Sequence, residues 1–123
     1  MIKLNIISLV ALTHYFLPDI TSCPEGYILN VASIVALYPL PYTSVYGATK
    51  AFVLSFTKAL RYEVRKTNVT VSCLCPGDTN TNFMIHAGGR KLKTQTAAPE
   101  EVAKVAMRSL LKHKAVIFPN RQA

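Results

Sequence analysis

The sequence lacks tryptophan and is poor in glycine and in acidic residues. Its 123 residues include five glycines and six Asp or Glu. No arrangement of the glycines gives G-x-G-x-x-G or G-x-x-x-x-G-K-[ST], so the sequence contains no recognisable glycine-rich phosphate loop. No segment is repeated or of low complexity, and 50% of the residues are hydrophobic, which argues against a disordered chain. We therefore expect a folded unit that is one domain or part of one.

The shortage of acidic residues leaves a formal charge of +8, which raises the question of a polyanionic partner. The basic residues are unevenly distributed, because residues 90–123 hold eight of them against two acidic ones. The basic segment 88–93 could contact phosphate, but it has no aromatic residues on which bases would stack. We therefore expect no nucleic-acid partner. Binding driven by the charge alone would depend steeply on salt.

The N-terminal apolar run, residues 6–12, is too short to span a membrane and has polar neighbours at Asn5 and Thr13. No cleavage site of small residues follows it, as a signal peptide would require. We favour an amphipathic core helix over a signal peptide and expect no membrane partner.

Three cysteines, Cys23, Cys73 and Cys75, leave an odd count for disulfide pairing. We expect the side chains of Cys73 and Cys75 to point to opposite faces of a strand, which would prevent a chelate or an unstrained disulfide. Buried, reduced thiols are the favoured interpretation, and they indicate a cytoplasmic protein. His14 and His86 have no Cys or carboxylate at ligand spacing, so we expect no metal site.

Six segments with helical or strand character alternate along the chain. Apolar residues at intervals of three and four predict helices, and short runs rich in β-branched residues predict strands. The alternating order favours an α/β fold in which helices cover a parallel sheet through right-handed crossovers. In chain order the segments are helix 2–17, strand 27–32, helix 44–66, strand 68–74, helix 99–113 and strand 115–118.

Local signals indicate where these segments begin and end. Pro18 is expected to stop the first helix, Ser44 to cap the second, and Pro99 to open the third. Strand 27–32 is almost wholly apolar, so we expect it to be buried on both faces of the sheet. Residues 77–98 are polar and predict an irregular, functional loop. With only three strands, the chain looks like the second half of a larger sheet.

The spacing that bears on chemistry joins Ser33, Tyr46 and Lys50. Tyr46 and Lys50 lie four residues apart on an expected helix and so share a face. Ser33 follows the C-terminal end of a strand, where open α/β sheets bind ligands. A tyrosine hydroxyl ordinarily ionises near pH ~10, and an adjacent ammonium favours the phenolate. Tyr46 could thus exchange a proton with an alcohol or carbonyl whose oxygen Ser33 holds.

This spacing has a second interpretation, because Tyr and Lys four residues apart also occur on ordinary amphipathic helices. In that case Lys50 would only extend its charged end into solvent from an apolar surface.

The wider context of these residues resembles the short-chain dehydrogenase/reductase family. Residues 30–33 read NVAS, residues 46–50 read YGATK, and Pro76-Gly77 follows in the order found in that family. The resemblance is firm over residues 4–83 and looser beyond. It implies a Rossmann-type doubly wound parallel sheet of which residues 1–123 are the C-terminal catalytic part. The cofactor-binding βαβ part would be absent from this chain.

The resemblance implies roles for particular residues. Tyr46 would be the general acid/base, while Lys50 would favour its phenolate and hold the nicotinamide ribose. Ser33 would bind the substrate oxygen. Asn5 would hold a water in a proton relay, or alternatively it is a polar residue satisfied between helices. Besides Tyr46 and Lys50, the residues implied in cofactor binding are Pro76, Gly77 and Thr81.

The implied activity is hydride transfer between NAD or NADP and a small carbonyl or secondary-alcohol substrate. The residues that choose between the two dinucleotides belong to the upstream part, and loop 77–98 would select the substrate. In the family, the helices that match 2–17 and 44–66 form the subunit interface, which implies a homodimer or tetramer. An alternative from another class is a truncated, non-catalytic fragment or subunit that acts only through association of these helices.

Overall fold

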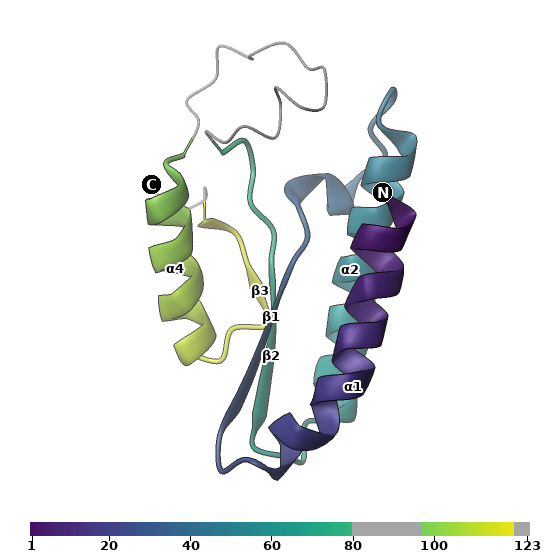
Figure 1. The fold of residues 1–123 in the computed structure, drawn as a ribbon. Helices are drawn as coiled ribbons and strands as arrows, with labels where there is room; N and C mark the ends of the chain where they lie inside the picture. The colour runs from purple at the N-terminus through teal and green to yellow at the C-terminus, as the bar shows by residue number, and fades with distance from the viewer. Residues whose placement is uncertain (80–96, 120–123) are drawn as a thin grey trace.

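The computed structural model describes residues 1–79 and 97–119. The described helices and strands are, in chain order, a π-helical turn (Lys3–Ile7), α1 (Ser8–Ser22), β1 (Gly26–Val31), a 3-10 turn (Ile34–Leu37), α2 (Ser44–Glu63), β2 (Val69–Leu74), α4 (Pro99–Leu111) and β3 (Val116–Ile117). The strands form one parallel sheet in the order β1-β2-β3. Helices α1 and α2 cover one face of the sheet and α4 covers the other (Figure 1). The expected α/β fold is confirmed.

Strand β2 lies in the middle of the sheet, and all six of its residues are buried. Strand β1 pairs with it in register from Gly26 opposite Val69 to Val31 opposite Leu74. The expectation that β1 is buried on both faces is met only in part. Ile28 packs on the side of α1 and α2, and Leu29 packs on the side of α4. The strand pairs on one side only, and Val31 at its end stays half exposed.

Pro18 does not end the first helix, contrary to expectation. Helix α1 continues to Ser22 with Pro18 inside it. The ring lies on an exposed surface, where the carbonyl left without its N–H partner can turn toward water. Thr21 Oγ1 lies 2.9 Å from the carbonyls of both Leu17 and Pro18, which supports the last turn.

Together with the π-helical turn, α1 forms one continuous helix over Lys3–Ser22. Of the described residues, this is the one helix long and apolar enough to cross a membrane by length and composition, and none of that segment is buried. Partly buried side chains of its inner face, among them Leu9, Leu17 and Ile20, nevertheless pack against the core.

The ends of α2 also differ from the prediction. The helix ends at Glu63 rather than at residue 66, and the position of the N-cap is held by Thr43 without a side-chain bond, not by Ser44. A turn then leads into β2, in which Thr67 Oγ1 accepts the N–H of Val69 at 3.2 Å. Hydrogen bonds of this local kind compete with helix continuation.

Helix α4 begins at Pro99 with Glu100 and Glu101 in its first turn, as predicted, and ends at Leu111. His113 adopts a left-handed φ of 57°. Its N–H donates to the carbonyl of Leu110 at 2.9 Å, and that of Lys114 donates to Ser109 at 3.0 Å. These bonds close a Schellman motif at the helix end, where glycine is the usual residue.

Gly26 opens β1 at a point where α1 comes too close for a side chain. A Cβ added there would lie 2.5 Å from Ile20 Cγ2 and 2.9 Å from the Ile20 carbonyl oxygen. We expect Gly26→Ala to lower the free energy of unfolding by about 1–3 kcal/mol, the usual effect of overpacking, measured by urea titration. Gly47→Ala is the matched control, because nothing lies within 4 Å of the added methyl group. Equal stability of Gly26→Ala and the unsubstituted chain would contradict this account.

Candidate active site

Four of the predicted site residues lie at one end of the molecule. Ser33 follows the C-terminal end of β1, and Tyr46 and Lys50 lie in the first turns of α2. Asn5 lies in the π-helical turn that precedes α1. The C-terminal ends of β1 and β2 and the N-terminal ends of both helices point to the same edge, the upper one in Figure 1. Parallel strands joined by helical crossovers produce this convergence.

Lys50 and Tyr46 share a face of α2, as their spacing predicts. Lys50 Nζ lies 5.7 Å from the centroid of the Tyr46 ring and donates a hydrogen bond to the carbonyl of Val31 at 3.1 Å. Both side chains are half-buried. Burial lowers the pKa of Lys50 below its ordinary value, because desolvation disfavours the ammonium form. The hydrogen bond ties the ammonium group to the end of β1, beside the aromatic ring.

Ser33 is buried where the chain leaves β1. Its Oγ accepts the N–H of Val35 at 3.3 Å and so caps the 3-10 turn that follows. Because this bond uses a lone pair and not the hydroxyl proton, Ser33 can still donate to an oxygen brought to this edge.

The segment after β2 lies beside Ser33. The N–H of Ile34 donates to the carbonyl of Pro76 at 2.9 Å, so the two chain segments are joined where they leave the sheet. Pro76 and Gly77 are both half-buried at this place. The structure thus brings these two predicted cofactor-binding residues to the same edge as Ser33. Thr81 and most of loop 77–98 lie outside the described residues.

Asn5 is held by a residue that the sequence analysis did not single out. Its Nδ2 donates to Thr49 Oγ1 at 3.1 Å, and that hydroxyl donates to the carbonyl of Tyr46 at 2.7 Å. A second pair, which is fully buried, repeats the arrangement two turns along α2, where Asn30 Nδ2 donates to Thr57 Oγ1 at 3.0 Å. The available signal was threonine eight residues apart on the face of α2 that also carries the buried Val53.

The prediction that Cys73 and Cys75 point to opposite faces is wrong. Residues two apart in a strand share a face, and both thiols lie in one buried cluster with Ala32 and Val53. A hydrogen bond between the thiols lowers the pKa of Cys73 and raises the pKa of Cys75. All three cysteines are free, but Cys23 is exposed rather than buried.

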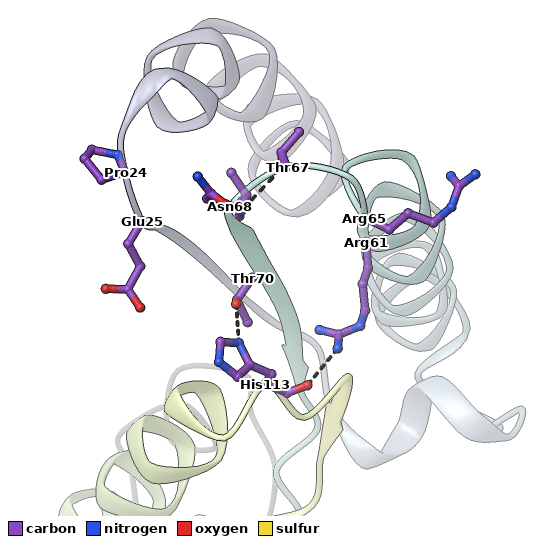
Figure 2. Close-up of a pocket in the computed structure, with 9 residues that line it drawn as sticks. Pro24, Glu25, Arg61, Arg65, Thr67, Asn68, Thr70 and His113 are labelled. Carbon is purple, nitrogen blue, oxygen red and sulfur yellow. Dashed lines mark hydrogen bonds between the residues drawn. The ribbon is translucent and has the colours of Figure 1, made fainter.

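A separate cleft of about 620 Å³ lies at the opposite, N-terminal edge of the sheet (Figure 2). Arg61 borders it and donates to the carbonyls of Val71 at 2.6 Å and His113 at 2.7 Å. Thr70 Oγ1 lies 2.6 Å from His113 Nδ1, and Arg65 points away from the cleft in Figure 2. These groups join β2 and α2 to the end of α4, so we assign the cleft a structural role.

No three His, Cys, Asp or Glu side chains gather as metal ligands within residues 1–79 and 97–119. That the protein uses no metal stays a prediction.

A family model described as short chain dehydrogenase matches residues 1–91, which include Asn5, Ser33, Tyr46 and Lys50. The chain belongs to the short-chain dehydrogenase family. The resemblance noted in the sequence is thereby confirmed.

Two relatives illustrate the range of the family. A sulfoacetaldehyde reductase from Chromohalobacter salexigens is 43% identical over 91 residues, which cover 72% of this chain and 36% of that protein. Human 17-beta-hydroxysteroid dehydrogenase type 3 is 41% identical over 81 residues, which cover 66% of this chain and 26% of that protein. Relatives that share this segment are thus named for very different substrates.

Solved structures agree with the fold over nearly the whole chain. A short-chain dehydrogenase from Sphingobium yanoikuyae in complex with NADPH superposes with a TM-score of 0.91 at 28% identity, covering 99% of this chain and 48% of that one. The closed form of a serine dehydrogenase complexed with NADP+ gives 0.83 at 30% identity, covering 96% and 53%. The sheet is therefore Rossmann-like. The chain spans 36–46% of the length of the first curated relatives it matches.

Proposed function

We propose that this chain supplies the catalytic part of an NAD(P)-dependent oxidoreductase that interconverts carbonyl compounds and secondary alcohols. The observation that carries the proposal is the meeting of Ser33, Tyr46 and Lys50 at the C-terminal edge of the sheet, with Lys50 Nζ 5.7 Å from the Tyr46 ring centroid. The names of the relatives support the same reaction class, because they are reductases and dehydrogenases.

In the proposed reaction, the Ser33 hydroxyl donates a hydrogen bond to the substrate oxygen and holds it within reach of Tyr46. Tyr46 donates a proton to that oxygen during reduction and accepts one during oxidation. The ammonium of Lys50 stabilises the phenolate that remains after donation. Asn5, at the start of the neighbouring helix, would take part in returning the proton from solvent.

A nicotinamide dinucleotide would supply the hydride when bound. Lys50 fits its ribose, because an ammonium on a half-buried stem donates well to paired hydroxyl groups. Pro76 and Gly77 fit the position beside the nicotinamide, since they adjoin Ser33 through the Ile34 to Pro76 hydrogen bond. The structural relatives hold NADPH, NADP+ or NAD, so either dinucleotide is compatible with the proposal.

The proposed domain organisation makes residues 1–123 the C-terminal catalytic part of a single Rossmann domain. Its cofactor-binding βαβ part lies outside this sequence. Two observations support this proposal. The sequence has no glycine-rich phosphate loop, and the solved relatives place the same fold in about half of their length.

The test is a fusion that restores a complete domain. The part of the C. salexigens sulfoacetaldehyde reductase that precedes its matched stretch is joined in front of this chain, and we call the product the completed domain. It is given NADH or NADPH with a panel of small aliphatic, aromatic and steroid ketones, and oxidation of the nicotinamide is followed by absorbance. A folded completed domain that binds the dinucleotide but reduces no ketone would refute the proposed activity.

The alternative is that the 123-residue chain by itself acts only through association. The missing phosphate loop favours this alternative, because a dinucleotide needs backbone N–H groups and a helix N-terminus to bind its pyrophosphate. Titration of NADH or NADPH into the 123-residue chain separates the two functions. Micromolar binding would contradict the alternative.

Exposed apolar side chains on α1 and α2 support a proposed homo-oligomer formed through segments 2–17 and 44–66. Leu12 is 57% exposed and Phe16 56% exposed one turn apart on α1, and Tyr62 on α2 is 65% exposed. Exposed apolar side chains that gather on one surface are typical of an interaction site. We expect Phe16→Glu to shift a dimer or tetramer toward monomer in sedimentation velocity. Leu111→Glu is the control, since Leu111 is equally exposed on α4 at the other face of the sheet. A monomeric unsubstituted chain would contradict the interface.

We further propose that the protein is cytoplasmic and that neither a membrane nor a nucleic acid is its partner. The free thiols of Cys73 and Cys75 support a reducing compartment. The family model includes the apolar helix Lys3–Ser22, which favours a helix of the domain over a membrane anchor.

A further inference from the structure

We propose that Thr49 is a positioning residue that fixes which way the side-chain amide of Asn5 faces. Thr49 is only 1% exposed and lies on α2 between Tyr46 and Lys50. Its hydroxyl contacts two groups at once, the Asn5 amide at 3.1 Å and the Tyr46 carbonyl at 2.7 Å. These two hydrogen bonds connect the π-helical turn before α1 to the first turn of α2, which carries the proposed acid/base.

The direction of these hydrogen bonds follows from the number of protons. A threonine hydroxyl has one proton, and a backbone carbonyl can only accept. At 2.7 Å from the Tyr46 carbonyl, the Thr49 hydroxyl must therefore donate to it. It has no proton left for Asn5, so Asn5 must present Nδ2 as the donor. Thr49 consequently excludes the flipped amide, in which Oδ1 and the threonine oxygen would face each other as two acceptors.

The consequence for Asn5 is an acceptor with a fixed position. With Nδ2 held by Thr49, Oδ1 occupies the other branch of the amide and can accept a hydrogen bond from a water molecule. A water that links Lys50 to solvent must donate as well as accept, so it needs such an acceptor. This step rests on the proposed function, whereas the amide orientation does not.

Helix α2 contains its own control in Thr57. This residue is also 1% exposed, accepts an asparagine amide (Asn30 Nδ2) at 3.0 Å and donates to a carbonyl of its own helix (Val53) at 2.6 Å. It lies eight residues beyond Thr49, two turns further from Tyr46 and Lys50. Thr57→Val therefore removes the same chemical group from the same kind of site without touching Asn5.

The first measurement is nuclear magnetic resonance of the side-chain amides in the 15N-labelled 123-residue chain. We expect one Asn5 Nδ2 proton to exchange slowly with water, and Thr49→Val to abolish this protection. Thr49→Ser should restore it, because serine keeps the hydroxyl. Thr57→Val should change the Asn30 amide and leave Asn5 unaltered. An Asn5 amide that is the same in Thr49→Val and in the unsubstituted chain would overturn the proposal.

The second measurement uses the completed domain and needs no assignment of spectra. Thr49→Val should lower kcat about tenfold with little change in KM, a part of what a general acid–base system contributes. Thr49→Ser should recover most of the rate, and Thr57→Val should stay within about twofold of the parent. An equal loss of kcat in Thr49→Val and Thr57→Val would show that Thr49 has only a structural role and would overturn the proposal. If the parent has no turnover, the proposed activity fails, and the amide measurement still decides the orientation.

Discussion

Tyr46→Phe is expected to lower kcat of the completed domain by about 10² to 10⁴-fold, the range that a positioned proton donor contributes. The substitution removes one hydroxyl and keeps the ring that packs beside Lys50, whose Nζ lies 5.7 Å from the ring centroid. Dinucleotide binding and the melting temperature should therefore change much less than the rate. Steady-state kinetics and thermal unfolding of the same preparation check both statements.

Tyr42→Phe is the matched control for this loss. Tyr42 precedes Tyr46 by four residues, and its side chain is fully exposed. Its hydroxyl should contribute nothing to the rate, so the variant should turn over like the parent. Retained turnover in Tyr46→Phe would remove Tyr46 from the mechanism. An equal loss in both variants would point to a general effect on this part of the chain.

The site could be predicted from sequence because it depends on spacing and on the order of the elements. Four residues on a helix place Tyr46 and Lys50 on one face whatever the rest of the fold does. The alternation of helices and parallel strands then brings Ser33 and Pro76 to the C-terminal edge. The helical spacing is local and the order of the elements is topological. Neither depends on the residues at which each helix or strand begins and ends.

The errors arose where three-dimensional surroundings decide the outcome. Pro18 is a helix breaker in an interior but is accepted on the exposed side of α1. The burial of β1 was overestimated because sequence does not say which strand lies at an edge. The prediction that Cys73 and Cys75 point to opposite faces misjudged strand geometry. Side chains alternate along a strand, so residues two apart lie on the same face.

Thr49 was missed for a different reason. A threonine inside a helix has no distinctive pattern in a single sequence, and its role depends on a partner 44 residues away, Asn5. Contacts between distant segments are set by how α1 and α2 pack, which helical periodicity does not specify. Its role therefore follows only from the hydrogen bonds of the folded chain.

Lys50→Met is expected to lower kcat/KM of the completed domain by about 10²-fold, the effect of removing one well-placed charge from a catalytic site. Methionine keeps an unbranched side chain and removes the ammonium, which donates to the Val31 carbonyl at 3.1 Å and lies beside the Tyr46 ring. Because burial disfavours the charged form of Lys50, the loss of that charge should leave the melting temperature nearly unchanged.

The pH dependence separates an electrostatic role of Lys50 from a purely steric one. In the oxidation direction Lys50→Met should lower the rate throughout the pH range, because no ammonium stabilises the anion that accepts the substrate proton. The parent should also lose activity at high pH. Burial lowers the pKa of Lys50 below its ordinary value of 10.5, so its charge disappears at a lower pH than that of a solvated lysine. This decline should be missing from Lys50→Met.

Lys58→Met, an exposed lysine two turns further along α2, is the control and should keep the parent profile. If Lys50→Met also kept the parent profile and lost only affinity for the dinucleotide, Lys50 would bind cofactor without assisting proton transfer. The positive charge at this edge of the sheet would then stabilise the bound ribose, and the phenolate of Tyr46 would depend on the bound dinucleotide for its stabilisation.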